Sequence, residues 1–248
     1  MFSIILDAGH GGTDPGAVYK NYLEKNFNLK IVLTLKKYIE DNYKNIIVYL
    51  TRVDDNDYSL KYRYTLSNQL KPSLFISIHC NAGGGTGFES YLREKPSKTE
   101  IYYRDVIHDN IVKYNNQFKI ANRGKKFRNM DVTYFNLYPA MLLEVLFIDN
   151  PNDLKFLLDD EYIKGWCEVV GNGVASIFKL EKKIYEPVSP PIELEPVQQK
   201  KVEITTYDDI YNEYLNIKSE LEQLKTNISN TFEKIINTFQ SIINNLKK

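Results

Sequence analysis

Two histidines and one glutamate stand where they could bind a metal ion. His10 lies in LDAGHGGTDPGA, Glu24 in YLEKN and His79 in SIHCNA. Two imidazoles and one carboxylate are a ligand set typical of catalytic Zn²⁺, which takes three protein ligands and leaves a fourth position open. A lone histidine near a strand end is more often structural, but here two of only three histidines follow or end predicted strands. We therefore interpret His10, Glu24 and His79 as candidate metal ligands.

The segment between His10 and Glu24 leaves two interpretations of the glutamate open. The glycines around His10 let the backbone turn sharply after the first predicted strand. The spacing to Glu24 suits a loop that returns at the start of a helix, where Glu24 could point back toward the strand end. A glutamate in the first turn of a helix is also favoured by the helix dipole without any metal.

Glu144 is the second carboxylate that could do chemistry, because it interrupts the apolar run MLLEVLF at 141–147. A buried carboxylate is costly unless it is paired or faces a cavity, and both neighbours of Glu144 are apolar. One interpretation is a structural salt bridge. The other is a general base, since an apolar setting raises the pKa of a carboxylate and suits it to take a proton from water.

Three other features have both a functional and a structural interpretation. Asn81 could donate a hydrogen bond to a substrate, or it could fix the turn after His79. The glycine cluster at 83–87 predicts a mobile loop, which is either a rim of a cleft or a plain connection. His108 lies in a predicted helix without a metal-like partner nearby in sequence, and we expect it at the surface.

The elements that position these residues alternate along the chain. Short apolar runs rich in β-branched residues predict strands at 3–7, 46–51, 74–78 and 141–147. Apolar residues at helical spacing predict helices at 26–40, 60–70, 101–114 and 160–178. The pattern predicts an α/β fold with a mostly parallel twisted sheet flanked by helices on both faces. Functional residues gather at the carboxyl ends of strands in such sheets.

The chain changes character after residue 180. Residues 181–206 are rich in proline and predict a semi-rigid linker. In residues 207–248, apolar side chains recur at steps of four and three, which is typical of a coiled-coil helix. We therefore expect a catalytic domain at 1–180, followed by a linker and a helix that forms a homo-oligomer through 207–246 or binds a partner.

Composition and charge exclude several classes of protein. The chain has 248 residues, of which 43% are apolar, enough for a substantial core. Lys plus Arg and Asp plus Glu both number 32, so the net charge is zero and the basic surface of a nucleic-acid binder is not expected. The sequence begins MFSIILDAGH, without a basic segment, and no 18 apolar residues run together. We expect no signal peptide and no membrane insertion, and two reduced cysteines.

Several motifs together carry a resemblance to a known family. These are LDAGHGGTDPGA, YLEKN, YLTR, SLKYRYTLSNQLKPSLFISIHCNA, GFESY and PAMLLEVLFIDNPND. In order and spacing they resemble the zinc-dependent N-acetylmuramoyl-L-alanine amidases of the amidase-3 type, which occur as phage endolysins, bacterial autolysins and sporulation amidases. The likeness covers residues 3 to 180. It implies Zn²⁺ bound by His10, Glu24 and His79, with Glu144 as the catalytic residue.

The resemblance implies a peptidoglycan hydrolase that cuts between N-acetylmuramic acid and the L-alanine of the stem peptide. Two other classes are considered. A different zinc peptidase of the wall would use the same residues on another amide, and a wall-binding scaffold would not need all four site residues. The N-terminus favours a phage endolysin that waits in the host cytoplasm and acts on the wall after release, over a bacterial autolysin or mother-cell lytic amidase.

Overall fold

The computed structural model describes residues 1–183 and residue 223. A compact unit spans Met1–Tyr185. The predicted linker and coiled-coil helix lie outside the described residues, apart from 181–183 and 223, so the coiled coil and its oligomerisation stay predictions. Within the described part, no helix has the length and apolar character needed to cross a membrane.

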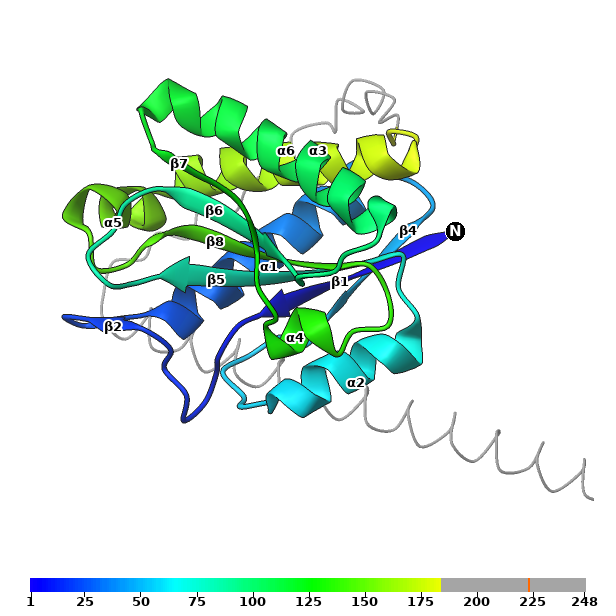
Figure 1. Ribbon diagram of the computed structural model, residues 1–248, viewed down its shortest axis with the longest axis horizontal. Coiled ribbons are helices and arrows are strands. Elements are labelled where there is room, and N and C mark those ends of the chain that lie inside the picture. Colours follow the sequence, from blue (N-terminus) through cyan, green and yellow to red (C-terminus); the bar gives the residue numbers. More distant parts are fainter. Residues whose placement is uncertain (184–222, 224–248) are drawn as a thin grey trace, which may run out of the picture. The chain divides into compact units, whose positions relative to one another are not determined.

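A six-stranded sheet with the order β4-β1-β5-β8-β6-β7 forms the centre of this unit (Figure 1). Its strands are β1 (Phe2–Ala8), β4 (Ile46–Leu50), β5 (Leu74–Asn81), β6 (Phe88–Leu92), β7 (Asn122–Phe127) and β8 (Ala140–Phe147). β1 is parallel to β4 and β5, and β5 is parallel to β8. β6 is antiparallel to β8 and parallel to β7. The predicted α/β fold with a mostly parallel sheet is therefore confirmed.

The sequence patterns predict the four adjacent strands β4, β1, β5 and β8 but miss β6 and β7. β7 has the sequence NRGKKF and lies at the edge of the sheet, where charged side chains replace apolar alternation. β6 carries a glutamate and a serine between its apolar ends, and both are buried. Polar groups that are satisfied only by tertiary contacts leave no apolar period in the sequence.

Helices cover both faces of the sheet (Figure 1). The helices are α1 (Glu24–Asn42), α2 (Leu60–Leu70), α3 (Lys98–Asn115), α4 (Asp131–Tyr134), α5 (Pro151–Leu158) and α6 (Asp160–Phe178), with a 3₁₀ turn η1 (Asn116–Phe118). α1, α3 and α6 pack together on one face, and α2 and α4 lie on the other. A small hairpin of β2 (Val18–Tyr19) and β3 (Tyr22–Leu23) occupies the loop between β1 and α1.

Strand alternation divides the core into a large and a small cluster. Ile4, Leu6 and Ile76 face the large cluster under α1, α3 and α6, whereas Phe75 and Leu142 belong to the small one. Because side chains alternate along a strand, His79 and Glu144 lie on the side of Phe75 and Leu142. The small cluster therefore leaves room for the candidate site at the carboxyl ends of β5 and β8.

His108 is buried, which corrects the prediction that it lies at the surface. Its exposed fraction is 1%. Its Nδ1 pairs with the hydroxyl of Ser90 at 2.8 Å and its Nε2 with the side-chain oxygen of Asn122 at 3.1 Å. The inner face of α3 contains other polar residues that also find partners. The apolar spacing that predicts this helix, with Ile107 and Ile111 buried, does not reveal that His108 is buried as well, because its burial depends on Ser90 and Asn122.

Candidate metal centre and active site

His10, Glu24 and His79 converge, as the sequence predicts for a metal site. One ligand atom from each residue lies within 4.8 Å of the others. Nε2 of His10 is 3.2 Å from Oε2 of Glu24, and Nδ1 of His79 is 3.0 Å from Oε1. His10 follows β1, Glu24 begins α1 and His79 lies near the end of β5. Three elements that are distant in sequence thus meet at one point.

This cluster fits a zinc ion by its donor chemistry. Two imidazole nitrogens and a carboxylate oxygen are the donors that a catalytic Zn²⁺ site uses. The histidine side chains remain 25% and 17% exposed, whereas Glu24 is 5% exposed. A cavity of about 400 Å³ opens beside both histidines, between the loop after β1 and the start of α2. Glu24 is therefore held inside the protein, while both histidines face an open cavity.

Glu24 is the most firmly held of the three groups. Its Oε2 accepts a hydrogen bond from the backbone N–H of Ala17 at 2.8 Å. Its Oε1 accepts from the Asn28 side chain at 3.2 Å and from the backbone N–H of Cys80 at 3.0 Å. Burial alone would raise the pKa of Glu24, but the two histidines outweigh it and hold the pKa well below its usual value. Glu24 is therefore an ionised carboxylate whose orientation is fixed, as a metal ligand requires.

Glu24 raises the pKa of both histidines, whereas they lower the pKa of Glu24. Burial lowers the pKa of His10, but Glu24 and Asp14 outweigh that effect and raise it to about 9. Asp14 contacts Nδ1 of His10 with its Oδ2 at 2.7 Å, which orients the ring. The pKa of His79 is raised as well, by Glu24 against the effect of burial. A metal ion must displace the protons that these rings hold in its absence.

Two buried arginines fix the backbone that carries His10. His10 has a φ of 62°, in the left-handed region that most residues avoid. Arg63 donates from Nη2 to the carbonyl of His10 at 2.8 Å and from Nη1 to that of Ala8 at 2.6 Å. Arg52 donates to the carbonyls of Ala8 and Gly9 at 3.0 and 3.1 Å. The guanidinium groups thus hold three successive carbonyls at the exit of β1.

Asp7 compensates the charge of Arg63 and is a site residue that the sequence analysis misses. Its side chain is fully buried, and its Oδ1 lies 2.7 Å from Nη1 of Arg63. It also accepts hydrogen bonds from Ser77 at 2.6 Å and Thr51 at 2.7 Å. The sequence contains a signal that could have identified Asp7, because this residue interrupts an apolar strand as Glu144 does.

Two glycines are required because neighbouring site residues leave no room for a side chain. A Cβ at Gly9 would lie 2.2 Å from Cε1 of His79. A Cβ at Gly16 would lie 2.6 Å from Oε2 of Glu24, and the φ of Gly16 is 66°. The glycines around His10 therefore permit close packing of the ligands as well as a sharp turn.

Glu144 lies beside the candidate metal site, on the strand next to the one that carries His79. It pairs in register with His79 on β5 and with Glu89 on β6. Among the described residues, its Oε2 has no hydrogen-bond partner and no cation pairs with it. Burial raises the pKa of Glu144 to about 7, and Glu24 and Glu89 add to the shift against the effect of His79. These contacts disfavour the salt-bridge interpretation and leave a carboxylate suited to proton transfer.

A bulge in β8 after Glu144 explains why the residues that follow Glu144 do not alternate between apolar and polar. The register of β5 and β8 shifts between the pair of His79 with Glu144 and the pair of Asn81 with Phe147. Two residues of β5 are therefore matched by three of β8, and the two intervening residues of β8 are buried. The bulge turns Glu144 and Phe147 to the same side of the sheet.

Asn81 and the glycine loop after it have partners within the protein. The side-chain amide of Asn81 donates to Oε1 of Glu89 at 2.6 Å, and its oxygen accepts from the backbone of Ala82 at 3.0 Å. In the loop 83–87, the first two N–H groups donate to Asp149. These contacts match the turn-fixing alternative for Asn81, while its contact with a substrate stays a prediction.

Comparisons with known proteins agree with the sequence motifs. Residues 4–176 match the family model described as N-acetylmuramoyl-L-alanine amidase. The chain is 37% identical over 182 residues to the N-acetylmuramoyl-L-alanine amidase CwlM of Bacillus licheniformis, covering 73% of this chain and 71% of that protein. It is 38% identical over 181 residues to the endolysin of Bacillus phage SPP1, covering 72% and 66%.

A solved structure agrees as well. The fold is similar to that of the catalytic domain of CwlV, an N-acetylmuramoyl-L-alanine amidase of Paenibacillus polymyxa, with a TM-score of 0.68 and 28% identity. That match covers 73% of this chain and all of that domain. Sequence and structure comparisons therefore select the same part of the chain.

Proposed function

The chain belongs to the family of N-acetylmuramoyl-L-alanine amidases, and we propose that His10, Glu24 and His79 hold the zinc ion with which it hydrolyses peptidoglycan. The bond cut is the amide between N-acetylmuramic acid and the L-alanine of the stem peptide. The observation that supports the zinc site best is the convergence of three ligand atoms within 4.8 Å of one another.

Glu144 performs the proton transfers in this proposal. When bound, zinc supplies a Lewis acid that polarises a carbonyl group and lowers the pKa of water. Glu144 accepts the proton of the attacking water and then donates it to the alanine nitrogen as the amide bond breaks. Its raised pKa and its Oε2, which has no partner within the described part of the chain, support this role, because a carboxylate of pKa about 7 can both take up and release a proton near neutral pH.

The remaining site residues position those that react. Glu24 stays ionised and keeps its orientation through three donors, and Asp14 orients the ring of His10. Arg52 and Arg63 hold the backbone on which His10 lies. Their buried charges make this loop rigid, so that the ligands need little rearrangement when the ion binds.

The biological role that we propose is that of a phage endolysin, with residues 1–180 as the catalytic domain. The similarity to the endolysin of phage SPP1 supports this role. The similarity to CwlM leaves a bacterial lytic amidase as the alternative. A homo-oligomer through 207–246 would raise the local concentration of catalytic domains on the wall. Analytical ultracentrifugation should show an oligomer for the whole chain and a monomer for residues 1–180, and a monomeric whole chain would refute this part.

Mass spectrometry of products from purified peptidoglycan tests the activity. The protein is incubated with zinc, with a chelator, and as Glu144→Ala. We expect stem peptides with a free N-terminal alanine, released only with metal and about 10²-fold to 10⁴-fold more slowly by the variant. Metal-dependent cleavage of another amide would identify a different zinc peptidase of the wall. Cleavage that persists with the chelator would refute the zinc proposal.

A further inference from the structure

A row of side chains crosses the sheet beyond the catalytic glutamate. His79, Glu144 and Glu89 are register partners on the adjacent strands β5, β8 and β6. The next strand, β7, carries Arg123 and Lys126, which both bind Glu89. Neighbouring strands lie about 4.8 Å apart, so the β7 backbone is about 10 Å from that of β8. The two cations therefore lie within reach of a substrate whose scissile bond is at Glu144.

Glu89 is covered by its hydrogen-bond and ion-pair partners. Two of these partners are cations, so the group as a whole has an excess of positive charge. Nε of Arg123 lies 2.7 Å from Oε2 of Glu89, and Lys126 contacts the same oxygen. Asn81 and Tyr91 donate to the other oxygen at 2.6 and 2.9 Å. The carboxylate is 3% exposed, whereas the cationic side chains are 35% and 34% exposed. An incoming ligand thus meets two cations and very little of the carboxylate.

Aromatic rings and ionic contacts hold both cations in place. The guanidinium of Arg123 lies over the ring of Phe147 at 4.7 Å, and the ammonium of Lys126 lies over Tyr91 at 5.6 Å. Burial raises the pKa of Glu89, but Lys126 and Arg123 outweigh it and hold the pKa below its usual value. Glu89 therefore stays ionised and fixes two cations that a ligand need not reorder.

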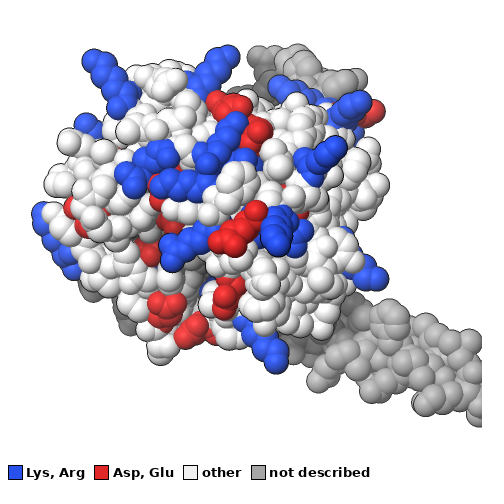
Figure 2. Space-filling view, in the orientation of Figure 1, with Lys and Arg blue, Asp and Glu red and all other residues white. Residues whose placement is uncertain are grey.

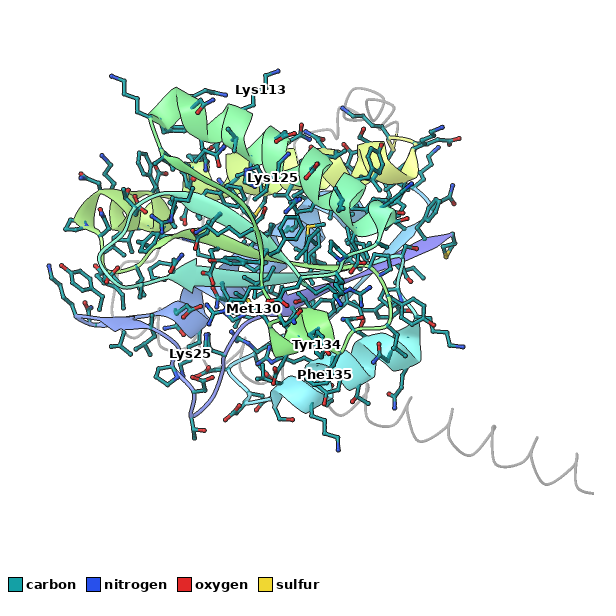
Figure 3. All side chains as sticks on the ribbon, in the orientation of Figure 1. Lys25, Lys113, Lys125, Met130, Tyr134 and Phe135 are labelled. Carbon is teal, nitrogen blue, oxygen red and sulfur yellow. The ribbon has the colours of Figure 1, made fainter. Side chains whose placement is uncertain are left out.

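The charge is concentrated on β7 although the whole chain is neutral. Residues 122–130 contain four cations and no acidic residue. Figure 2 shows Lys and Arg side chains gathered over the part of this face that β7 crosses in Figure 1. Lys125, labelled in Figure 3, pairs instead with Asp105 and Asp109 of α3. Adjacent residues of β7 thus have different roles, because side chains alternate along the strand.

We infer that Arg123 and Lys126 form a carboxylate-binding subsite for the stem peptide. This inference rests on the proposed amidase function. The second residue of peptidoglycan stem peptides is a D-glutamate joined through its side-chain carboxyl, so its α-carboxyl is either free or amidated. One residue spans about 3.5 Å of extended chain, and the arginine side chain covers much of the remaining distance to β7. The subsite recognises the free α-carboxylate and discriminates against the amide.

Two synthetic substrates that differ in one group test the subsite. Both are N-acetylmuramoyl tripeptides with L-lysine third, and their D-glutamate carries either an α-carboxylate or an α-carboxamide. We expect the wild-type protein to prefer the carboxylate about 10-fold or more in kcat/KM, the range for hydrogen bonds to a charged group. The preference should appear in KM, because the contact is made equally in ground and transition states. It should also weaken as salt increases.

Variants of three neighbouring residues separate recognition from stability. Arg123→Gln and Lys126→Gln should each reduce the ratio of kcat/KM for the two substrates several-fold, whereas Arg123→Lys should retain part of it. Lys125→Gln is the control, since it removes the same charge from the same strand and should leave the ratio unchanged. Partial unfolding lowers both rates together, so it does not change the ratio.

Each outcome has a separate meaning for the two proposals. Cleavage of the amidated substrate by the wild-type protein supports the amidase function independently of the subsite. Equal rates for the two substrates, a ratio insensitive to salt, or a ratio unchanged in Arg123→Gln would overturn the subsite and leave the two cations with the sole role of neutralising Glu89. Failure to release alanine peptides from either substrate or from whole peptidoglycan would refute the amidase function itself.

Discussion

Glu24 and Glu144 are two carboxylates of the candidate site, the first buried and the second partly buried, and their surroundings act on them in opposite ways. Glu24 accepts three hydrogen bonds and lies against two histidines, so its pKa is well below the usual value. Glu144 lies in an apolar strand with an Oε2 that has no partner among the described residues, and burial raises its pKa to about 7.

The difference shows how one fold assigns two roles to the same side chain. A loop and a helix N-terminus supply backbone N–H groups and imidazoles to Glu24, whereas no described residue donates a hydrogen bond to Oε2 of Glu144. Pairs of titratable groups whose environments separate their pKa values mark acid and base roles in enzymes. In the function that we propose, the separation distinguishes a ligand that stays charged, Glu24, from a group that exchanges protons, Glu144.

Exchanging each glutamate for glutamine gives the sharpest test of this comparison. Glu144→Gln should lower kcat about 10³-fold while zinc affinity stays within a few-fold of the wild-type value, because only proton transfer is lost. Glu24→Gln should lower zinc affinity by at least 10²-fold, since a charged ligand is removed. Calorimetric zinc titration and turnover of peptidoglycan measure the two effects. Equal loss of zinc binding in both variants would break the comparison.

Asp7→Asn tests the ion pair with Arg63, which holds the backbone at His10. The variant leaves Arg63 buried without its counter-ion, which should destabilise the protein by about 3 kcal/mol at neutral pH. The pKa of Asp7 is below its ordinary value of 3.8, because Arg63 and two hydroxyl donors outweigh burial. Its contribution is therefore complete above pH 3.8 and is lost as the pH falls through the folded-state pKa.

Denaturant unfolding at several pH values measures this effect. The free energy of unfolding should differ most between wild type and Asp7→Asn above pH 5, and the two should converge in acid. A difference that stays constant down to the lowest pH at which both proteins fold would contradict an ionised Asp7.

Glu144→Gln should also raise the free energy of unfolding of the metal-free protein, whereas Asp7→Asn should lower it. The pKa of Glu144 is raised from 4.5 to about 7, so folding costs free energy as the pH rises through this interval. Removing the charge should add about 3 kcal/mol above pH 7 and nothing below pH 4.5. Thermal unfolding in chelator at pH 4.5 and pH 8 tests this, and a variant less stable than wild type at pH 8 would contradict it.

Asn28→Ala has the smallest expected effect and removes one of the donors that orient Glu24. Asn28 is fully buried and donates to Glu24 and to the carbonyl of Gly9. Its removal should lower zinc affinity about 10-fold, as is usual for groups that orient a ligand. Asn42→Ala, at the other end of α1, is the matched control and should leave zinc affinity unchanged. Similar losses in both variants would indicate a general effect on the helix.

Several features of the protein follow from the sequence alone. The strands and helices with a clear apolar period are predicted within a few residues, because burial of one face imposes that period. The candidate ligands and Glu144 are also identifiable, since a charged group in a strand or a histidine at a strand end stands out locally.

Other features depend on contacts between distant segments, and only the tertiary structure decides them. The burial of His108 needs Ser90 and Asn122, and the edge strand β7 is recognisable only beside β6. The ion pair between Arg63 and Asp7 joins residues 56 positions apart in the sequence. Polar groups of this kind carry no period in sequence, because their burial depends on partners that the fold brings to them.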